Sequence, residues 1–282
     1  MPAPSRAPRR RSWLFVPGAD ERAHERAARS GADVLIHELE DFTPPPLRER
    51  ARALAPALYA RWRAAGAVVA VRVNPLSTCG RDDLAAVLRG SPDVVMMSKV
   101  AAPDDVRALA EAAPGTAELV PNIETAAGLV RTFDIVRASP RVTAALLASE
   151  DMVADLGTAR SRGGEELAYA RARFLVECRA AGVEAIDCPY TFSDARGAAA
   201  EARGARRLGY RMKSLVVPAH AAAVNRAFTP QPAEIARARR IVAAFEKARA
   251  AGRERASVDG ALVEVPIYAA AKRLLESLRD SA

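Results

Sequence analysis

Five carboxylates and one arginine lie just past the ends of four separate apolar runs of this chain. The runs are 34–36, 68–71, 119–120 and 144–147, and the charged residues that follow them are Glu40, Asp41, Arg72, Glu124, Glu150 and Asp151. Short apolar runs are typical of buried parallel strands, and the carboxyl ends of parallel strands in a closed barrel meet at one rim. The spacing therefore predicts an acidic rim that would attract a divalent cation.

The chemistry expected of this rim is that of a bound cation beside an arginine. Carboxylate oxygens favour Mg2+ or Mn2+ over zinc, and a magnesium site typically uses one or two of them, with substrate and water completing the octahedron. Glu124 and Asp151 are the predicted ligands. Arg72 offers a planar fork for a substrate carboxylate or a developing enolate oxygen. Together these residues predict a site for a 2-oxo acid.

The two predicted metal ligands and one nearby lysine have more than one interpretation. An acid at a strand exit also caps the following helix, which would explain Glu124 or Asp151 without a metal. Lys99 follows the apolar run 94–97, where some barrels carry a Schiff-base lysine. We favour an ion-pair role for Lys99, because nearby carboxylates would keep its ammonium charged.

The histidines show no metal-ligand spacing. His37 lies within an apolar run and is expected to be packed and hydrogen-bonded. His24 and His220 lie in helical sequence, where solvent exposure is expected.

Length, composition and charge limit the fold and the partners. The 282 residues, 50% of them hydrophobic, suffice for one barrel of roughly 200 to 250 residues plus a tail. Lysine and arginine number 42 against 34 acids, a formal net charge of +8 that would suit a phosphate-bearing ligand or nucleic acid. The arginines are nevertheless scattered among acids, with one basic run at 6–11, and aromatic residues make up only 5%. We therefore expect no nucleic-acid partner.

The cysteines and the first residues favour a cytoplasmic protein. Cys79, Cys178 and Cys188 are odd in number and form no CxxC pair, which favours a reducing compartment and no structural zinc. Residues 1–11 are rich in proline and arginine and lack the apolar core of a signal peptide. Because no run reaches the ~20 apolar residues of a membrane helix, we expect no membrane association.

Strand and helix patterns alternate eight times along the chain. Predicted strands cover 13–16, 34–39, 68–73, 94–97, 119–123, 142–147, 185–187 and 212–217, and predicted helices cover 20–30, 47–65, 82–88, 104–112, 125–137, 165–181, 194–208 and 219–227. Eight such units predict the α/β class, with a (β/α)8 TIM barrel over residues 1–228. Helices at 233–251 and 268–278, with a short segment at 257–265 between them, form a helical arm over 229–282.

Seven short segments, taken in order, resemble one family. They are RSWLFVPG at 11–18, LED at 39–41, RVNP at 72–75, SKV at 98–100, IET at 123–125, EDMVADLG at 150–157 and VNRAFTP at 224–230. The series is similar to the citrate lyase β-subunit-like branch of the HpcH/HpaI aldolase superfamily, which includes malyl-CoA and citramalyl-CoA lyases. This resemblance covers about 11–278. It implies a Mg2+-dependent barrel, commonly trimeric, that cleaves a citryl-, citramalyl- or malyl-CoA type thioester into acetyl-CoA and a 2-oxo acid, or catalyses the reverse condensation.

The resemblance also implies roles for individual residues. The metal ligands would be Glu124 and Asp151, the substrate-binding residue Arg72, and the residues that hold the metal's waters and the rim Glu40 and Asp41. Family members carry an aspartate on the arm that reaches a neighbouring subunit's site and exchanges a proton with the acetyl-CoA methyl carbon. Glu264 stands at that position, so we expect a homo-oligomer whose arm packs on a neighbour.

The chain departs from the family's pattern at three places. The usual Leu-Asp-Leu-Glu-Asp motif is His-Glu-Leu-Glu-Asp at 37–41 and is followed by Phe42, where a small residue is common. Val217 replaces the histidine of an Ile-His-Pro segment. Glu264 replaces the arm's aspartate and adds a methylene, and a misplacement of ~1 Å can cost ~100-fold in rate.

Two other functions remain open. One is a pyruvate-type class II aldolase that acts on free hydroxy-oxo acids without CoA, although such enzymes carry a histidine where Asp41 stands. The other is a catalytically weak protein, or a subunit of a larger complex, that binds CoA or a dicarboxylate; Val217 and Glu264 favour this interpretation.

Overall fold

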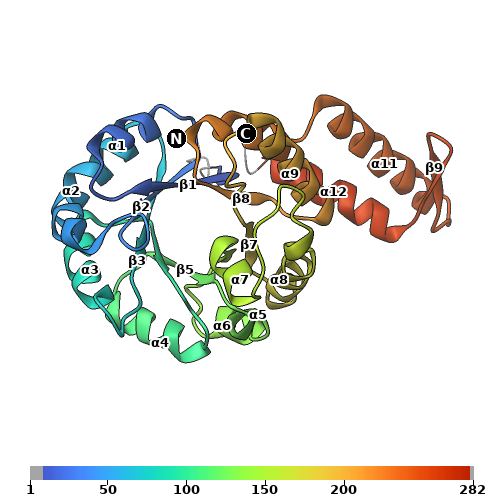
Figure 1. Cartoon of the computed structure of the whole chain (residues 1–282). Helices are drawn as coiled ribbons and strands as arrows, with labels where there is room; N and C mark the ends of the chain where they lie inside the picture. Colours follow the sequence, from blue (N-terminus) through green and yellow to red (C-terminus); the bar gives the residue numbers. More distant parts are fainter. Residues whose placement is uncertain (1–8, 280–282) are drawn as a thin grey trace. The chain divides into compact units, whose positions relative to one another are not determined.

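Eight parallel strands close into a barrel, which confirms the predicted (β/α)8 fold (Figure 1). The computed structural model describes residues 9–279. The strands are β1 (Ser12–Pro17), β2 (Val34–Glu38), β3 (Val68–Val73), β4 (Val94–Met97), β5 (Glu118–Ile123), β6 (Ala144–Leu147), β7 (Glu184–Asp187) and β8 (Met212–Leu215). They pair in sequence order, and β8 closes the ring against β1. Arg10–Phe228 form this compact unit.

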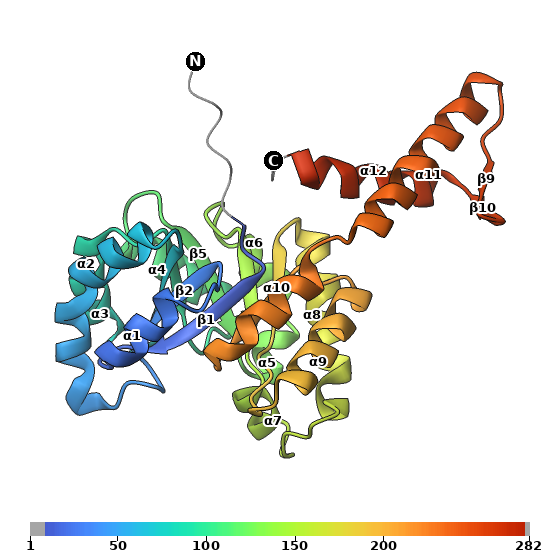
Figure 2. The same cartoon turned by 90° about the horizontal axis from the view of Figure 1, so that it is seen from above.

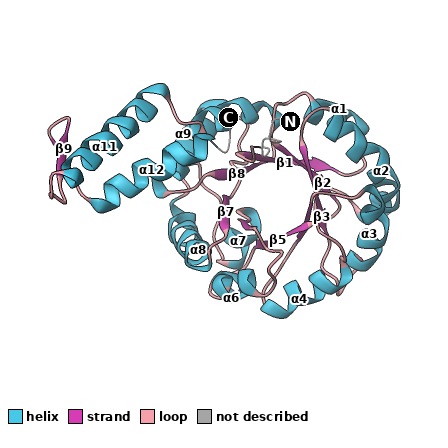
Figure 3. Ribbon diagram, turned by 180° about the vertical axis from the view of Figure 1, so that it is seen from behind, coloured by secondary structure: helices cyan, strands magenta, loops and turns pink. Residues whose placement is uncertain are grey.

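Helices surround the strands (Figure 3). They are α1 (Glu21–Ala28), α2 (Arg48–Ala64), α3 (Gly80–Val87), α4 (Pro103–Ala112), α5 (Ala126–Leu129), α6 (Thr132–Arg137), α7 (Glu150–Asp155), α8 (Ala168–Ala181), α9 (Ala195–Leu208) and α10 (Ala221–Phe228). Short 3-10 turns are η1 (Pro45–Leu47), η2 (Leu88–Gly90), η3 (Glu165–Leu167) and η4 (Pro218–His220). Several helices begin at side-chain caps; Asp20, for example, accepts the N–H of Ala23 at 2.9 Å.

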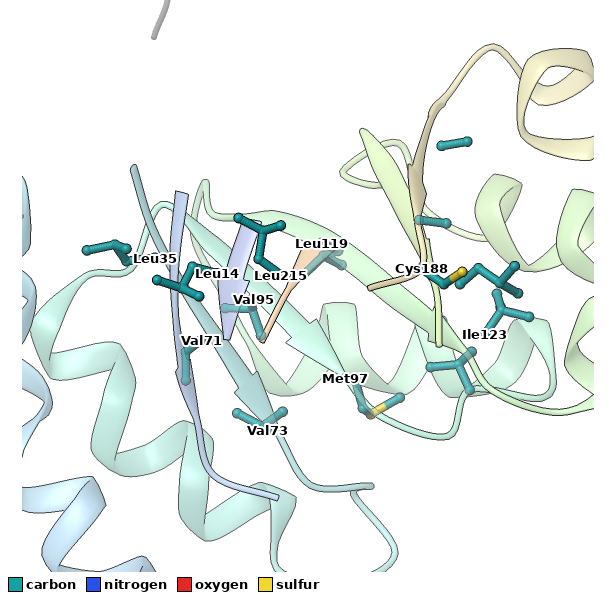
Figure 4. Packing of buried hydrophobic residues seen from close by; sticks show 14 of the residues in the cluster. Leu14, Leu35, Val71, Val73, Val95, Met97, Leu119, Ile123, Cys188 and Leu215 are labelled. Carbon is teal, nitrogen blue, oxygen red and sulfur yellow. The ribbon is translucent and has the colours of Figure 1, made fainter. Parts of the chain in front are cut away.

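Both faces of the strands are buried. Val34 and Ile36 belong to the cluster inside the barrel, whereas Leu35 between them packs in the outer cluster under the helices. Figure 4 shows part of that outer cluster, including Leu35 and Val71. Burial of both faces explains why the strands read as continuous apolar runs, and it makes any charged residue on an inward face conspicuous.

The predicted helix 125–137 is wrong as one element, because the structure divides it into α5 and α6. Arg131 leaves the helical region with φ −117°, and the Thr132 hydroxyl donates to the carbonyl oxygens of Gly128 and Leu129, at 3.3 and 3.0 Å. Helix α7 was not predicted from the sequence. This helix is only six residues long, too short for its periodicity to be recognised.

The prediction that His24 and His220 are exposed is wrong, since both are buried. His24 Nε2 donates to the carbonyl oxygen of Pro17 at 2.9 Å, and His220 Nε2 donates to that of Ser193 at 3.2 Å. The packed role predicted for His37 is confirmed: Nε2 lies 3.0 Å from the carbonyl oxygen of Gly18, and burial lowers the pKa of His37 to about 3. These rings link loops to helices, a role that residue type alone does not reveal.

A buried ionic network joins β7 and β8 to the helix layer. Lys213 Nζ lies 2.6 Å from Asp187 Oδ2 and 2.7 Å from Glu201 Oε1, and Lys213 and Asp187 are fully buried. Arg171 on α8 donates two hydrogen bonds of 2.8 Å to Asp187. Burial opposes ionisation of Asp187, but the charges of Lys213 and Arg171 outweigh it and lower its pKa. These pairs hold two strands to two helices through charge rather than apolar packing.

The described residues after Phe228 belong to a second unit, the helical arm. The arm contains α11 (Pro232–Ala250), a hairpin of β9 (Ala256–Val258) and β10 (Ala261–Val263), and α12 (Val265–Arg279), which starts earlier than predicted (Figure 2). Asp259 and Gly260 form the hairpin turn with φ of 52° and 77°. Phe245 on α11 stacks on Tyr268 on α12, with ring centroids 4.7 Å apart. The two helices thus share a small core of their own.

Part of the basic run at 6–11 lies outside the described residues, 6–8 being the undescribed part. Arg10 makes two hydrogen bonds of 2.6 Å to Glu118, and Arg11 Nε donates to Asp33 Oδ2 at 2.8 Å. These two guanidinium groups therefore pair with acids of the barrel.

Between residues 9 and 279, no helix has both the length and the apolar character needed to cross a membrane.

We predict that Lys213→Met destabilises the protein, because the exchange leaves the buried carboxylates of Asp187 and Glu201 short of a cation. Removing one partner of a buried ion pair typically costs about 3 to 5 kcal/mol. Urea unfolding followed by circular dichroism would measure the free energy of unfolding. Lys247→Met, which alters an exposed lysine on α11, is the control. Equal stability of the Lys213 and Lys247 variants would contradict the prediction.

Candidate active site

Glu38, to which the sequence analysis assigns no role, is the buried centre of the site. It ends β2, and its carboxylate accepts the backbone N–H groups of Glu40 at 2.6 Å and Phe42 at 2.7 Å. It also accepts Arg72 Nε at 3.0 Å. Glu38 thereby fixes both the loop after β2 and the arginine. Side chains of a strand alternate between its two faces, so Glu38 shares the inward face of Val34 and Ile36. That alternation was the signal in the sequence that Glu38 points into the barrel.

Arg72 on β3 is the register partner of Glu38 and lies among several carboxylates. Its Nη2 lies 3.0 Å from Glu38 Oε1 and 3.1 Å from Glu40 Oε2, and its Nη1 lies 3.8 Å from Glu124 Oε1. The Phe15 ring covers one face, with its centroid 4.8 Å from the guanidinium carbon. Burial opposes the positive charge, but the surrounding carboxylates outweigh it and raise the pKa of Arg72. The guanidinium is therefore fixed in place and permanently charged.

Lys99 pairs with the two acids of the loop after β2. Its ammonium hydrogen-bonds to Glu40 Oε1 and lies 3.6 Å from Asp41 Oδ1. These contacts confirm the predicted ion-pair role of Lys99. The hydrogen bond to Glu40 raises the pKa of Lys99. Burial raises the pKa of Glu40 despite Arg72 and Lys99.

Glu124 follows β5 and is fully buried. Among the residues described, none donates a hydrogen bond to either of its carboxylate oxygens. Burial raises its pKa to about 8, and the acids Asp151 and Glu40 add to the effect against the opposing charge of Arg72. An ionised carboxylate without a hydrogen-bond donor is costly inside a protein, so this position calls for a cation or a proton.

Helix capping does not explain Glu124. The Thr125 hydroxyl caps α5 by accepting the N–H of Gly128 at 3.1 Å. Asp151 lies in the first turn of α7, whose cap position is held by Ser149.

A pocket of about 300 Å³ opens where these residues meet. The residues that line it are Phe15, Asp41, Phe42, Arg72, Leu146, Ala148, Ser149, Glu150, Asp151, Pro189, Thr191 and Val216. Strands β1, β3 and β6, the first turn of α7 and the loops after β2, β6, β7 and β8 supply them. The structure thus brings Arg72, Asp41 and Asp151 to one pocket, with Glu124 next to Arg72.

The oxygen donors of this site suit a hard divalent cation. Glu124 offers two buried oxygens that accept no hydrogen bond from the described chain, and Asp151 lines the adjacent pocket. Within residues 9–279 no group of three or more His, Cys, Asp or Glu side chains is placed to hold a metal. A site with one or two protein carboxylates, whose other positions are filled by substrate and water, is typical of Mg2+.

Glu264, the predicted proton-transfer residue, lies on the arm between β10 and α12. Its carboxylate lies 3.3 Å from Arg255 Nε and is partly exposed. Leu262, Val265 and Ile267, close to it in sequence, are exposed large apolar residues.

A family model and individual relatives both match most of this chain. Residues 11–218 match the HpcH/HpaI aldolase/citrate lyase family. The chain is 36% identical over 257 residues to a (3S)-malyl-CoA thioesterase of Cereibacter sphaeroides, covering 90% of this chain and 89% of that protein. It is 35% identical over 285 residues to the citrate lyase subunit beta of Escherichia coli, covering 94% and 92%.

A solved structure is similar over nearly the whole chain. Protein CitE from Mycobacterium tuberculosis, in complex with magnesium, acetoacetate and coenzyme A, superposes with a TM-score of 0.78 and 27% identity, covering 94% of this chain and 97% of that one.

We predict that Glu124→Gln stabilises the metal-free protein at neutral and alkaline pH. Burial raises the folded-state pKa from the ordinary 4.5 to about 8, so the folded state binds this proton more tightly than the unfolded chain. Wild-type stability should therefore fall as pH rises from about 4.5 to about 8, whereas the amide carries no charge at any pH. The difference at pH 8 should be on the order of a few kcal/mol.

Denaturant unfolding with a metal chelator present, at pH 5 and pH 8, would measure this difference. Glu111→Gln, at an exposed position on α4, is the control. A wild-type protein as stable as Glu124→Gln at pH 8 would show that Glu124 is not desolvated.

Proposed function

Because the chain belongs to the HpcH/HpaI aldolase/citrate lyase family and resembles a citrate lyase subunit beta, we propose that it is a Mg2+-dependent carbon–carbon lyase acting on a hydroxy-acyl-CoA thioester. The products of cleavage would be acetyl-CoA and a 2-oxo acid. In the reverse direction the same reaction would condense these two compounds. The observation that carries this proposal is that Arg72 and Asp151 line one pocket, with Glu124 Oε1 3.8 Å from Arg72 Nη1.

Glu124 and Asp151 would hold the cation. The two oxygens of Glu124, which accept no hydrogen bond from a described residue, support this assignment, as does the magnesium in the complex of the M. tuberculosis protein. When bound, Mg2+ would supply Lewis-acid polarisation of the substrate. Glu40 and Asp41 would hold water molecules at the rim, and their ion pairs with Lys99 keep the loop in place.

Arg72 would stabilise the charge that develops on the substrate. As the substrate hydroxyl loses its proton, the adjacent carbon–carbon bond breaks and its electron pair passes to the thioester α-carbon. Nη1 of Arg72 makes no hydrogen bond to another described residue, so it is free to donate to a substrate oxygen. Such a donor is preorganised, because Glu38 already holds the other side of the guanidinium.

The arm would complete the site of a second copy of the chain. Glu264 would give the α-carbon its proton, and the exposed Leu262, Val265 and Ile267 support burial of this segment against another subunit. We propose a homo-oligomer, a trimer or a multiple of one, in the cytoplasm. Three cysteines without disulfide partners in the described structure are compatible with that compartment.

Thioester hydrolysis is a second candidate function, because the chain is 36% identical to a malyl-CoA thioesterase.

An incubation with malyl-, citramalyl- and citryl-CoA and Mg2+, beside one with CoA-free hydroxy-oxo acids, separates the candidate functions. Free oxo acid together with acetyl-CoA would identify the lyase, whereas hydroxy acid and free CoA thiol would identify the hydrolase. Release of oxo acid only from CoA-free hydroxy-oxo acids would identify an aldolase, and no turnover would indicate a binding protein or a complex subunit.

Arg72→Lys should lower kcat/KM by roughly 100-fold or more while the protein folds normally, because an ammonium cannot keep the bond to Glu38 and donate to the substrate with the same planar geometry. Steady-state kinetics on the active thioester would test this. Arg61→Lys, at an exposed position on α2, is the control. Wild-type turnover by Arg72→Lys would mean that the arginine is structural.

Glu264→Ala should still bind Mg2+ and oxo acid but should lose about 100-fold in exchange of the acetyl-CoA methyl protons with deuterated solvent, because that exchange needs a base over the carbon. Glu264→Asp should keep the exchange. Proton NMR would follow the methyl signal, and Glu254→Ala, an exposed acid of the same arm, is the control. Equal rates in wild type and Glu264→Ala would assign Glu264 a purely structural position.

A further inference from the structure

The lining of the pocket beside Arg72 combines charged, hydroxyl and apolar side chains. The charged residues are Arg72 and the acids Asp41, Glu150 and Asp151, and the hydroxyl residues are Ser149 and Thr191. The other six are apolar: Phe15, Phe42, Leu146, Ala148, Pro189 and Val216. A ligand in this pocket would therefore meet apolar surface as well as charge.

Arg72 is the single cation among the twelve residues that line the pocket, all of which the structure describes. Its Nε and Nη2 are taken by Glu38 and Glu40, and Phe15 covers a face of the guanidinium. What remains of Arg72 can pair with one carboxylate of a ligand. Lys99, which lies outside the lining, is already paired with Glu40 and Asp41.

Phe42 is an exposed aromatic residue of the pocket lining whose position is fixed by two contacts. Its backbone N–H donates to Glu38 Oε2 at 2.7 Å, which holds the loop, and its ring meets Phe15 edge-on, with centroids 6.3 Å apart and planes at 72°. Phe15 in turn contacts the Arg72 guanidinium. Phe42, Phe15 and Arg72 thus form one continuous series of contacts.

We propose that this pocket selects a 2-oxo acid with a short uncharged substituent, and that Phe42 is a specificity-determining residue that excludes a second carboxylate. The inference rests on the proposed function and specifies its substrate class: thioesters that release a monocarboxylic oxo acid. A second carboxylate placed beside Phe42 would lose water against the apolar lining, and the lining offers no cation besides Arg72 to compensate for that loss. A methyl group at the same point gains apolar contact instead.

A pair of acids of matched length tests this proposal. 2-Oxobutyrate and oxaloacetate differ by a methyl group in place of a carboxylate, and pyruvate is the smallest acid of the series. Titration calorimetry with Mg2+ present should show 2-oxobutyrate and pyruvate binding at least roughly 10-fold more tightly than oxaloacetate. Phe42→Arg should reduce that preference at least 10-fold by supplying a cation, and Phe42→Leu should keep it. Leu208→Arg, which adds the same charge at an exposed position on α9, should leave it unchanged.

Oxaloacetate binding as tightly as 2-oxobutyrate to the wild type would overturn this inference and leave the lyase assignment standing. An unchanged preference in a folded Phe42→Arg variant would remove Phe42 from the selection. If none of the acids binds and no thioester is cleaved, the proposed function and the inference both fail.

Discussion

The ion pair between Glu38 and Arg72 is the contact on which the rest of the site depends. The two residues are partners across β2 and β3, and both are buried inside the barrel mouth. Glu38 also accepts two backbone N–H groups of the following loop, so one carboxylate orients the arginine and positions Glu40, Asp41 and Phe42. Gly18 lies against this strand end so closely that a Cβ atom there would be 2.5 Å from the Glu38 carbonyl oxygen. The loop after β1 therefore packs directly against Glu38.

The charges around this pair do not balance within the chain. Arg72 and Lys99 are two cations, which leaves a formal excess of four negative charges when all groups are ionised, because the acids number six: Glu38, Glu40, Asp41, Glu124, Glu150 and Asp151. The raised pKa values of Glu40 and Glu124 reflect that excess together with burial. The network around Lys213 shows the opposite arrangement, since its acids and bases match in the same barrel. A cluster with an excess of negative charge, in a barrel whose other buried charges are matched, is expected at a site that binds an added cation.

Much of the fold followed from the sequence, because apolar runs and their exits fix where strands lie and where charged residues meet. The rim positions of Arg72, Asp41 and Asp151 were predicted for that reason. Glu38 was not, because an acid inside an apolar run is assigned no site unless its face is considered. The burial of His24 and His220 depends on loops that pack over them, and the division of α5 from α6 depends on one threonine hydroxyl. Such tertiary contacts leave no local pattern in the sequence.

The placement of Glu38 opposite Arg72 also bears on how the barrel reaches its correct form. A shift of one residue between β2 and β3 would exchange the inward and outward faces of the moved strand. The apolar residues alone discriminate poorly against such a shift, because both faces of these strands are apolar. The shifted pairing would instead separate the two charges and bury each without its partner. The Glu38–Arg72 pair would therefore also reject misaligned strands during folding, and a substitution that removes either charge should lower the folding yield.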